Sequence, residues 1–190
     1  AIAEANPQRE VVLFAIGFET TAPANALTLH RAKAQGLVNF SSLVAQVLVP
    51  PALEALLDTP EHRIDAFLAA GHVCAVMGLD EYRPIAQRYR VPVVATGFEP
   101  VDILQGVLSA IQQLEAGEAH VDNVYARAVA PKGNTVAQAL LREVFEPVAR
   151  DWRGMGCIAQ SGLGLRPAYR AFDAVHRFDL PSAHTAAPSP

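Results

Sequence analysis

Short apolar runs alternate with longer stretches of helical periodicity over most of the chain. Residues 11–16 form a continuous apolar run that ends at a glycine, which is typical of a strand buried on both faces. From residue 21 to residue 35 apolar side chains recur at helical spacing, and a glycine again follows them. Residues 40–49 predict a second strand, and two prolines then open a short helix over residues 50–57, because proline is tolerated in a first helical turn.

The same alternation continues through the middle of the chain. The predicted elements are a strand at 65–68, a helix at 79–89, a strand at 92–96, a helix at 102–116, a strand at 121–129 and a helix at 135–145. The helix at 102–116 has the clearest apolar face, and either Asn134 or Thr135 is the expected N-cap of the last helix. Beyond Trp152 the pattern weakens into glycine-rich turns with one short element at 168–172.

The alternation of strands and helices predicts an α/β fold. Strands separated by helices of about 10 to 15 residues imply right-handed βαβ crossovers. We expect a mostly parallel sheet with helices on both faces, in a Rossmann-like arrangement. Residues 1–118 are expected to form the α/β core, and residues 119–180 a further α/β segment that packs on this core or on a domain outside the chain. Residues 181–190, rich in Pro, Ser and Ala, are expected to be a flexible tail.

Charge and apolar content exclude two classes of protein. The 190 residues carry 15 Lys and Arg against 19 Asp and Glu, a net charge of −4, without a basic run, so no nucleic-acid partner is expected. No apolar stretch approaches the roughly 20 residues of a membrane span, and the N-terminal segment lacks the pattern of a signal peptide. We therefore expect a cytoplasmic protein without a membrane partner.

The cysteine pattern indicates no metal site. Cys74 and Cys157 lie far apart, and neither a CxxC motif nor a Cys/His cluster occurs. A zinc site and a disulfide scaffold are therefore not indicated, and the cysteine usage fits a reducing cytoplasm.

Candidate chemistry lies where three predicted strands end. Ligands on open parallel sheets bind beyond the carboxyl ends of the strands. Three such ends carry a glycine and an ionisable residue, namely Glu19, His72 and Glu99. Parallel strands would direct all three toward one edge, where Gly71 and Gly97 allow the backbone to approach a ligand closely. We interpret the three ionisable residues together as a shared functional cleft.

A structural interpretation of these residues stays open beside the functional one. Either glutamate, taken alone, fits a favourable charge in the first turn of a helix, with Thr20 or Thr21 as the cap. His72 alone fits a packed histidine as well as a catalytic one. Trp152 and Arg153 fit a core anchor beside a surface ion pair as well as a binding site.

Several short segments, taken in order, resemble the HypD family of nickel–iron hydrogenase maturation proteins. The three longest lie at 17–23 (GFETTAP), 67–73 (FLAAGHV) and 96–106 (TGFEPVDILQG). The others lie at 123–125, 133–134, 152–156, 161–163 and 172–174. Their order and spacing cover nearly the whole chain up to about residue 178.

The resemblance implies a scaffold on which a metal centre is assembled. Together with a small HypC-type chaperone, such a protein supports assembly of an iron that carries cyanide and carbon monoxide ligands, and a HypE-type partner donates the cyanide. Family members have two similar α/β domains and a C-terminal iron–sulfur portion. Their GFET, GHV and GFEP motifs border the cleft between the domains, which carries this role over to Glu19, Thr20, Thr21, His72 and Glu99. The remaining candidate cleft or ligand-binding residues are Gly71, Gly97, Asn134, Trp152 and Arg153.

The chain also departs from the family pattern. The upstream cysteine motifs of the family and the C-terminal cysteines that hold its 4Fe-4S cluster are absent here. Ala70 replaces a frequent proline, and Gln46 replaces a frequent histidine. We therefore expect a central fragment of a HypD-type protein that holds no cofactor itself and is inactive alone. The iron with its cyanide and carbon monoxide ligands and the 4Fe-4S cluster are implied for the full-length protein only.

Two other functions stay open at this point. A stand-alone α/β enzyme would use Glu19 and Glu99 as an acid–base pair, with His72, on a small metabolite. A purely structural interaction module would use the glutamates only to cap helices.

Overall fold

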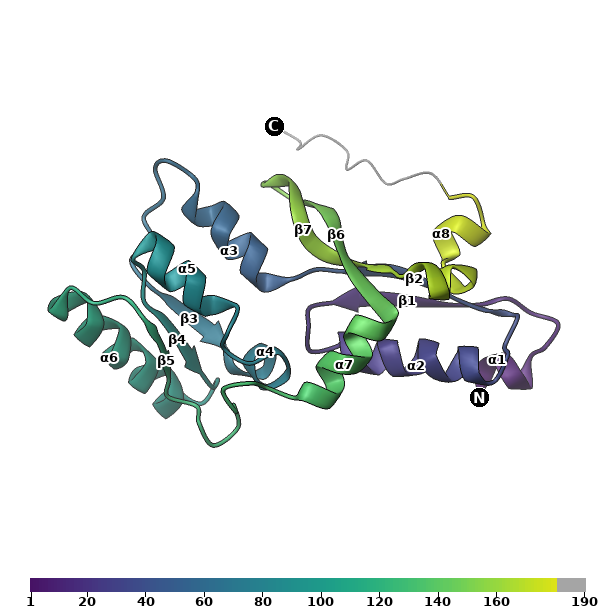
Figure 1. Ribbon diagram of the computed structural model, residues 1–190, viewed down its shortest axis with the longest axis horizontal. Coiled ribbons are helices and arrows are strands. Elements are labelled where there is room, and N and C mark those ends of the chain that lie inside the picture. Colours follow the sequence, from purple (N-terminus) through teal and green to yellow (C-terminus); the bar gives the residue numbers. More distant parts are fainter. Residues whose placement is uncertain (181–190) are drawn as a thin grey trace. The chain divides into compact units, whose positions relative to one another are not determined.

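The computed structural model describes residues 1–180 (Figure 1). The chain divides into two compact units. The first unit combines residues 1–51 with the described residues from 139 onward, and residues 52–138 form the second. The predicted boundary at residue 118 lies inside the second unit, and the predicted tail at 181–190 lies outside the described residues.

The first unit contains a two-stranded parallel sheet and a long antiparallel hairpin. Its elements are α1 (Ile2–Ala5), β1 (Val11–Gly17), α2 (Ala22–Ala34), β2 (Phe40–Gln46), β6 (Phe145–Trp152), β7 (Gly156–Leu165), the 3₁₀ helix η1 (Pro167–Phe172) and α8 (Ala174–Arg177). β1 and β2 pair along their whole length, from Val11 opposite Phe40 to Gly17 opposite Gln46. Helix α2 packs against both strands, so this part of the chain has the predicted βαβ order.

The prediction that β1 is buried on both faces is wrong. Ala15 is 1% exposed, whereas Val12, Phe14 and Ile16 are 47%, 57% and 59% exposed. Side chains alternate between the two faces of a strand, so these three apolar residues share one face. Among the described residues β1 has β2 as its single neighbouring strand, and this face stays open. An apolar run identifies a strand but not the elements that cover it.

The sequence predicts no strand at β6, and it predicts glycine-rich turns beyond Trp152, where the structure has β7. Gly154 lies at the tip of the β6–β7 hairpin with a φ angle of 81°, which favours glycine. Gly162 lies within β7 instead, where a Cβ atom would come within 2.1 Å of the Arg150 side chain. The guanidinium of Arg150 donates hydrogen bonds of 2.9 and 2.7 Å to the carbonyls of Val44 and Leu163. Gly162 thus gives Arg150 room to tie the hairpin to β2.

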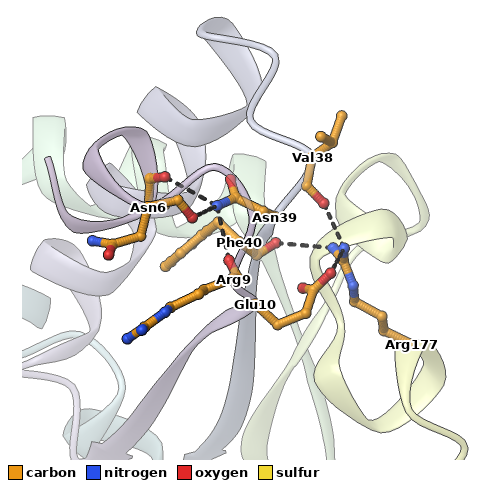
Figure 2. Close-up of polar contacts among 8 residues, drawn as sticks. Asn6, Arg9, Glu10, Val38, Asn39, Phe40 and Arg177 are labelled. Carbon is orange, nitrogen blue, oxygen red and sulfur yellow. Dashed lines mark hydrogen bonds and ion pairs between the residues drawn. The ribbon is translucent and has the colours of Figure 1, made fainter.

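Two polar side chains fasten the amino-terminal ends of β1 and β2 (Figure 2). The side-chain nitrogen of Asn39 lies 3.0 Å from three carbonyl oxygens of the N-terminal segment, those of Ala3, Asn6 and Arg9. Arg177, from α8, donates to the Val38 carbonyl and forms a 2.7 Å ion pair with Glu10. The N-terminal segment and α8 are therefore both held at this end of the sheet.

The second unit is built on a three-stranded parallel sheet. Its elements are β3 (Phe67–Ala70), α4 (Gly71–Met77), α5 (Tyr82–Tyr89), β4 (Val93–Thr96), α6 (Pro100–Ala116) and β5 (Val121–Asn123). The strand order is β3-β4-β5, and both pairings are parallel. A core cluster of this unit contains Leu57, Ile85 and Val91. Helices α3 (Val49–Leu57) and α7 (Thr135–Val144) carry the chain from one unit to the other.

The predicted α/β class is confirmed, and the β1–β2 and β3-β4-β5 sheets are parallel, whereas the β6–β7 hairpin of the first unit is antiparallel. The Rossmann-like arrangement of one sheet with helices on both faces stays a prediction.

β5 is shorter than the predicted strand at 121–129, because the Asn123 side chain turns the backbone. Its amide oxygen accepts from the Tyr125 N–H, and its amide nitrogen donates to the Val129 carbonyl. The sequence pattern also misses α4, which begins at Gly71.

Helix α6 packs with its small and polar side rather than its apolar side. The buried residues are Asp102, Gly106, Ala110 and Gln113. Seven large apolar side chains are 39% to 68% exposed: Val101, Ile103, Leu104, Val107, Leu108, Ile111 and Leu114. Helical spacing predicts this helix correctly but does not say which of its faces is covered.

None of the helices in residues 1–180 has the length and apolar character of a membrane span.

Candidate functional site

The carboxyl ends of β3 and β4 bring two of the predicted site residues to one edge. The two strands are parallel neighbours, so the segments that follow them leave the sheet on the same side. His72 follows β3, and Phe98 and Glu99 follow β4. The imidazole of His72 contacts the Phe98 ring, with the ring centroids 5.0 Å apart. His72, Phe98 and Glu99 are all exposed, so this edge is accessible within the second unit.

Gly71 and Gly97 leave room for the aromatic ring of Tyr125. A Cβ atom on Gly71 would lie 2.5 Å from Tyr125 Cδ1, and one on Gly97 would lie 2.7 Å from Tyr125 Cε2. Tyr125 belongs to the turn that follows β5, so its ring packs against the starts of both strand-end segments. The two glycines therefore shape this edge by their small size, and a direct ligand-binding role for them stays a prediction.

An ion pair between the buried Asp102 and the exposed Arg127 supports the same edge. Asp102 is 3% exposed and receives two hydrogen bonds of 2.6 Å from the guanidinium of Arg127. This guanidinium also stacks over the Tyr125 ring, 4.5 Å from its centroid. Hydrogen bonding from Arg127 lowers the pKa of Asp102 below its usual value, and the same contact raises the pKa of Arg127. Both groups are therefore charged at neutral pH.

Glu99 stands at the N-cap position of α6 without capping it. Its side chain forms no cap hydrogen bond, and Pro100 at the first helical position has no N–H to offer one. The contact runs in the reverse direction, because the Asp102 carboxylate accepts a hydrogen bond from the Glu99 backbone N–H. The exposed carboxylate of Glu99 is therefore not used by the helix that follows it.

Glu19 lies at the carboxyl end of β1, in the first unit. It is 1% exposed, and its Oε1 accepts a 2.7 Å hydrogen bond from the backbone N–H of Val49. Val49 is the first residue of α3, whose next two residues, Pro50 and Pro51, have no N–H. Glu19 therefore holds the start of a helix 30 residues further along the chain, rather than the first turn of the helix that follows it.

Thr21 fastens the turn between β1 and α2. It occupies the N-cap position of α2, but the expected side-chain cap is not formed. Its hydroxyl lies 3.2 Å from the carbonyl oxygens of both Ile16 and Phe18. It also accepts a 3.1 Å hydrogen bond from the side chain of Gln46, which is fully buried. Thr20 is half-buried in the same turn, and a ligand-binding role for either threonine stays a prediction.

Asn134 and Trp152 have structural partners in the described chain. The side chain of Asn134 accepts a 3.0 Å hydrogen bond from the Ala137 N–H, which confirms it as the N-cap of α7. The indole N–H of Trp152 donates a 2.8 Å hydrogen bond to the Ser161 hydroxyl, across the β6–β7 hairpin. Arg153 is exposed in the turn of that hairpin. These contacts fit the structural interpretation, and binding roles for the three residues stay predictions.

The predicted site residues are divided between the two units. Glu19 belongs to the first unit, and His72 and Glu99 belong to the second. Their shared cleft therefore stays a prediction, whereas the contact between the GHV and GFEP segments is present in the structure.

Three residues that support the edge of the second unit were not among the predicted site residues: Asp102, Tyr125 and Arg127. Asp102 follows Glu99 by three residues, which is the spacing of a capping box, so a signal for it was present. Tyr125 and Arg127 lie in a segment whose alternating pattern predicts a strand, and in a strand they would share one face. The turn at Asn123 instead brings both to the ends of β3 and β4.

The described residues offer no ligand set for a metal ion or an iron–sulfur cluster. Within residues 1–180, no group of three or more His, Cys, Asp or Glu side chains could hold a metal ion. Cys74 is buried in the second unit, and Cys157 is exposed in the β6–β7 hairpin of the first. These residues do not fit a 4Fe-4S cluster, and no chemical step of this chain is assigned to one.

Comparison with known proteins identifies the relatives of the chain. The sequence profile of the HypD family, described as the hydrogenase formation hypA family, matches residues 1–189. The hydrogenase maturation factor HypD of Rhodobacter capsulatus is 46% identical over 180 residues, which cover 94% of this chain and 48% of that protein. HypD of Escherichia coli K12 is 45% identical over 178 residues, which cover 93% of this chain and 48% of that protein. The chain thus spans about half the length of the curated relatives it matches.

Proposed function

The chain belongs to the HypD family, and we propose that it serves hydrogenase maturation as one part of a scaffold on which an iron centre is assembled. The cargo is an iron that carries cyanide and carbon monoxide ligands. A small HypC-type chaperone and a HypE-type cyanide donor act with the scaffold in the cytoplasm. The identity of about 45% to maturation factors named HypD supports this assignment.

The observation that carries the proposal is the edge formed by His72 and Glu99. Both side chains are exposed, and the segments that bear them meet through the contact of His72 with Phe98. Beneath them the Asp102–Arg127 ion pair and the Glu99 backbone hydrogen bond fix the start of α6. An exposed ionisable group on a rigid support is typical of a residue that acts on a ligand.

The two side chains supply complementary chemistry toward the proposed cargo. The nitrogen of an iron-bound cyanide accepts hydrogen bonds, and the imidazole of His72 donates one when it is protonated. The Glu99 carboxylate accepts a proton from a neighbouring donor. Glu19 is buried and its carboxylate holds the Val49 N–H, so we assign it a positioning role in the first unit rather than proton transfer.

The iron–sulfur cluster and the cysteine ligands belong, under this proposal, to the part of HypD proteins that this chain does not match. The described residues do not fit an iron–sulfur cluster, and the chain spans about half the length of its relatives. We therefore assign the cluster and the cysteine ligands of the iron to the other half. The chain is inactive alone under this proposal.

The test is a pair of conservative substitutions in the full-length protein that contains these residues. Glu99→Gln and His72→Gln remove the ionisable groups while keeping size and polarity. We expect each to lower the hydrogenase activity of the host at least tenfold, without a change in the melting temperature of the substituted protein. Glu115→Gln and His120→Gln are matched controls, because both residues are exposed on the same unit.

The controls are expected to keep the hydrogenase activity of the unchanged protein. Full hydrogenase activity with Glu99→Gln and with His72→Gln would contradict the proposed role of this edge. Turnover of a small metabolite by these 190 residues alone would instead favour the stand-alone enzyme.

A further inference from the structure

Strand β1 is an edge strand: no strand of residues 1–180 pairs with its outer side, where only the Ile16 carbonyl has a side-chain contact, with the Thr21 hydroxyl. The Val11 N–H donates to the Asn39 carbonyl at 2.9 Å, and the Gly17 carbonyl accepts from the Val47 N–H at 3.0 Å. In a parallel pair the backbone groups of successive residues alternate between the two sides of a strand. The odd-numbered residues of β1 therefore bond to β2, and the backbone N–H groups of Val12, Phe14 and Ile16 point away from it.

The same three residues also carry the open apolar face of β1. Val12, Phe14 and Ile16 are 47%, 57% and 59% exposed. An extended segment that pairs with the outer edge would therefore gain backbone hydrogen bonds and apolar contacts from one set of residues. This combination is the basis of strand addition to a sheet.

Nothing in β1 protects its edge against such pairing. Natural edge strands are blunted by charged residues, prolines or bulges. The sequence of β1, VVLFAIG, contains no charged residue and no proline, and its pairing with β2 runs without a register shift. A sheet of two strands is also smaller than the three or more strands that usually make a stable unit. The unit therefore fits a sheet that is completed by a further strand.

The outer edge of β2 differs in this respect. The Asp173 residue before α8 forms a bridge with Ser42, and Gly162 of the hairpin forms one with Val47 at the end of β2. The outer side of β2 is thus contacted by the same unit at Ser42 and just beyond the end of the strand. The edge of this sheet that is available to a further strand is therefore that of β1.

We propose that an extended segment from the half of the family's chain that lies outside these 190 residues pairs with the outer edge of β1 and covers its apolar face. The relatives contain about as many residues again as the part they share with this chain. A segment of the same polypeptide is present at a high effective concentration, so it competes well against a second copy of the chain. The inference goes beyond the proposed function, since it holds whether or not His72 and Glu99 act on the cargo.

The test measures amide hydrogen exchange residue by residue in this chain by NMR. It is recorded for the chain alone and after addition of the part of Rhodobacter capsulatus HypD that the chain does not match. We expect the added part to slow exchange at Val12, Phe14 and Ile16 at least tenfold. Leu13 and Ala15 are internal controls, because their amides already face β2 and change less. This alternation distinguishes edge pairing from general stabilisation.

Substitutions at exposed positions supply a second measurement. Phe14→Asp places a charge on the open face and is expected to weaken binding of the added part at least tenfold. Val38→Asp is the matched control, since Val38 is 80% exposed and lies outside β1. Its binding is expected to equal that of the unchanged chain.

Three outcomes overturn the inference. The first is that the added part does not bind, and the second is that it binds without the alternating protection in β1. The third is that the same protection arises in the chain alone together with a dimer mass in sedimentation, which assigns the edge to a second copy. Loss of hydrogenase activity with Glu99→Gln bears on none of these, so the two proposals fail independently.

Discussion

The Glu19 carboxylate accepts a hydrogen bond from the Val49 backbone N–H at 2.7 Å, so a residue at the end of β1 holds the start of α3. Because Pro50 and Pro51 follow Val49, this N–H is the single backbone donor among the first three residues of the helix. The contact therefore links the GFET motif to the segment that leaves the first unit.

Removing this carboxylate is expected to destabilise the first unit. Glu19→Ala leaves the half-buried Val49 N–H without its acceptor and empties the space of a side chain that is 1% exposed, which lowers the free energy of unfolding by about 1 to 3 kcal/mol. Glu19→Gln keeps an oxygen acceptor and is expected to cost less. Urea unfolding followed by the fluorescence of Trp152, the single tryptophan of the chain, reports on this unit. Glu146→Ala, in an ion pair of 3.9 Å with an exposed arginine, is the control and is expected to change stability by less than about 0.5 kcal/mol. Equal stability of Glu19→Ala and the unchanged chain would remove the positioning role.

The sequence predicts the ends of β1 and α6 well because the signals there are local. The apolar run of β1 stops at Gly17, and the helix of residues 100–116 stops at Gly117 with a φ angle of 68°. In both cases the signal consists of the apolar residues of the element and the glycine that directly follows them. The edge that carries His72 and Glu99 follows from the same signals, since parallel neighbours end on one side.

The parts that the sequence does not predict depend on residues far apart in the chain. Gly162 lies in a strand because the Arg150 side chain crosses it, and no local pattern distinguishes this glycine from a turn glycine. The partner of Glu19 is 30 residues away. The exposure of Phe14 depends on which elements cover β1, and hydrophobic periodicity does not contain that information.

Adding a methyl group at Gly97 is expected to disrupt the support of the candidate edge. Its Cβ would lie 2.1 Å from Asp102 Oδ2 and 2.7 Å from Tyr125 Cε2, so the Asp102 carboxylate must shift, and this oxygen accepts a hydrogen bond from Arg127. We expect Gly97→Ala to lower the free energy of unfolding by about 2 kcal/mol or more. Gly117→Ala is the comparison: its Cβ meets no atom within 4 Å, and only its φ of 68° opposes the change, at a cost of about 1 kcal/mol. Thermal unfolding, monitored by circular dichroism, shows which of the two variants is less stable. A larger loss of stability with Gly117→Ala than with Gly97→Ala would contradict the steric argument.

The Asp102–Arg127 ion pair predicts a specific dependence of stability on pH. The pKa of Asp102 is lowered in the folded chain by its hydrogen bonds to Arg127. A lowered carboxyl pKa stabilises the fold fully above the unfolded value of about 4, and this contribution is lost as the pH falls through the folded value. Arg127→Met removes the contribution at every pH. The difference in melting temperature between the unchanged chain and Arg127→Met is therefore expected to be largest near pH 7 and to shrink below pH 4.

The control for this pH series is Arg88→Met. Arg88 is exposed and lies 3.7 and 3.9 Å from its acidic partners, so its removal is expected to change the melting temperature little at any pH. A difference between the unchanged chain and Arg127→Met that stays constant from pH 7 to pH 3 would show that the pair acts through packing rather than through the charge of Asp102.

A second pH-dependent group lies in the first unit, where Tyr169 donates a 2.6 Å hydrogen bond to Glu143. Burial, together with this bond to a carboxylate, raises the pKa of Tyr169 to about 12. A raised tyrosine pKa stabilises the fold fully below the unfolded value of about 10, and the contribution is lost as the pH rises toward the folded value. Absorbance at 295 nm is expected to show one tyrosine step near pH 12 that is missing in Tyr169→Phe. The same variant is expected to lower the free energy of unfolding at pH 7 by about 1 to 2 kcal/mol, measured by Trp152 fluorescence. If the step that disappears in Tyr169→Phe lies near pH 10, the hydroxyl is neither buried nor bonded to Glu143 in solution.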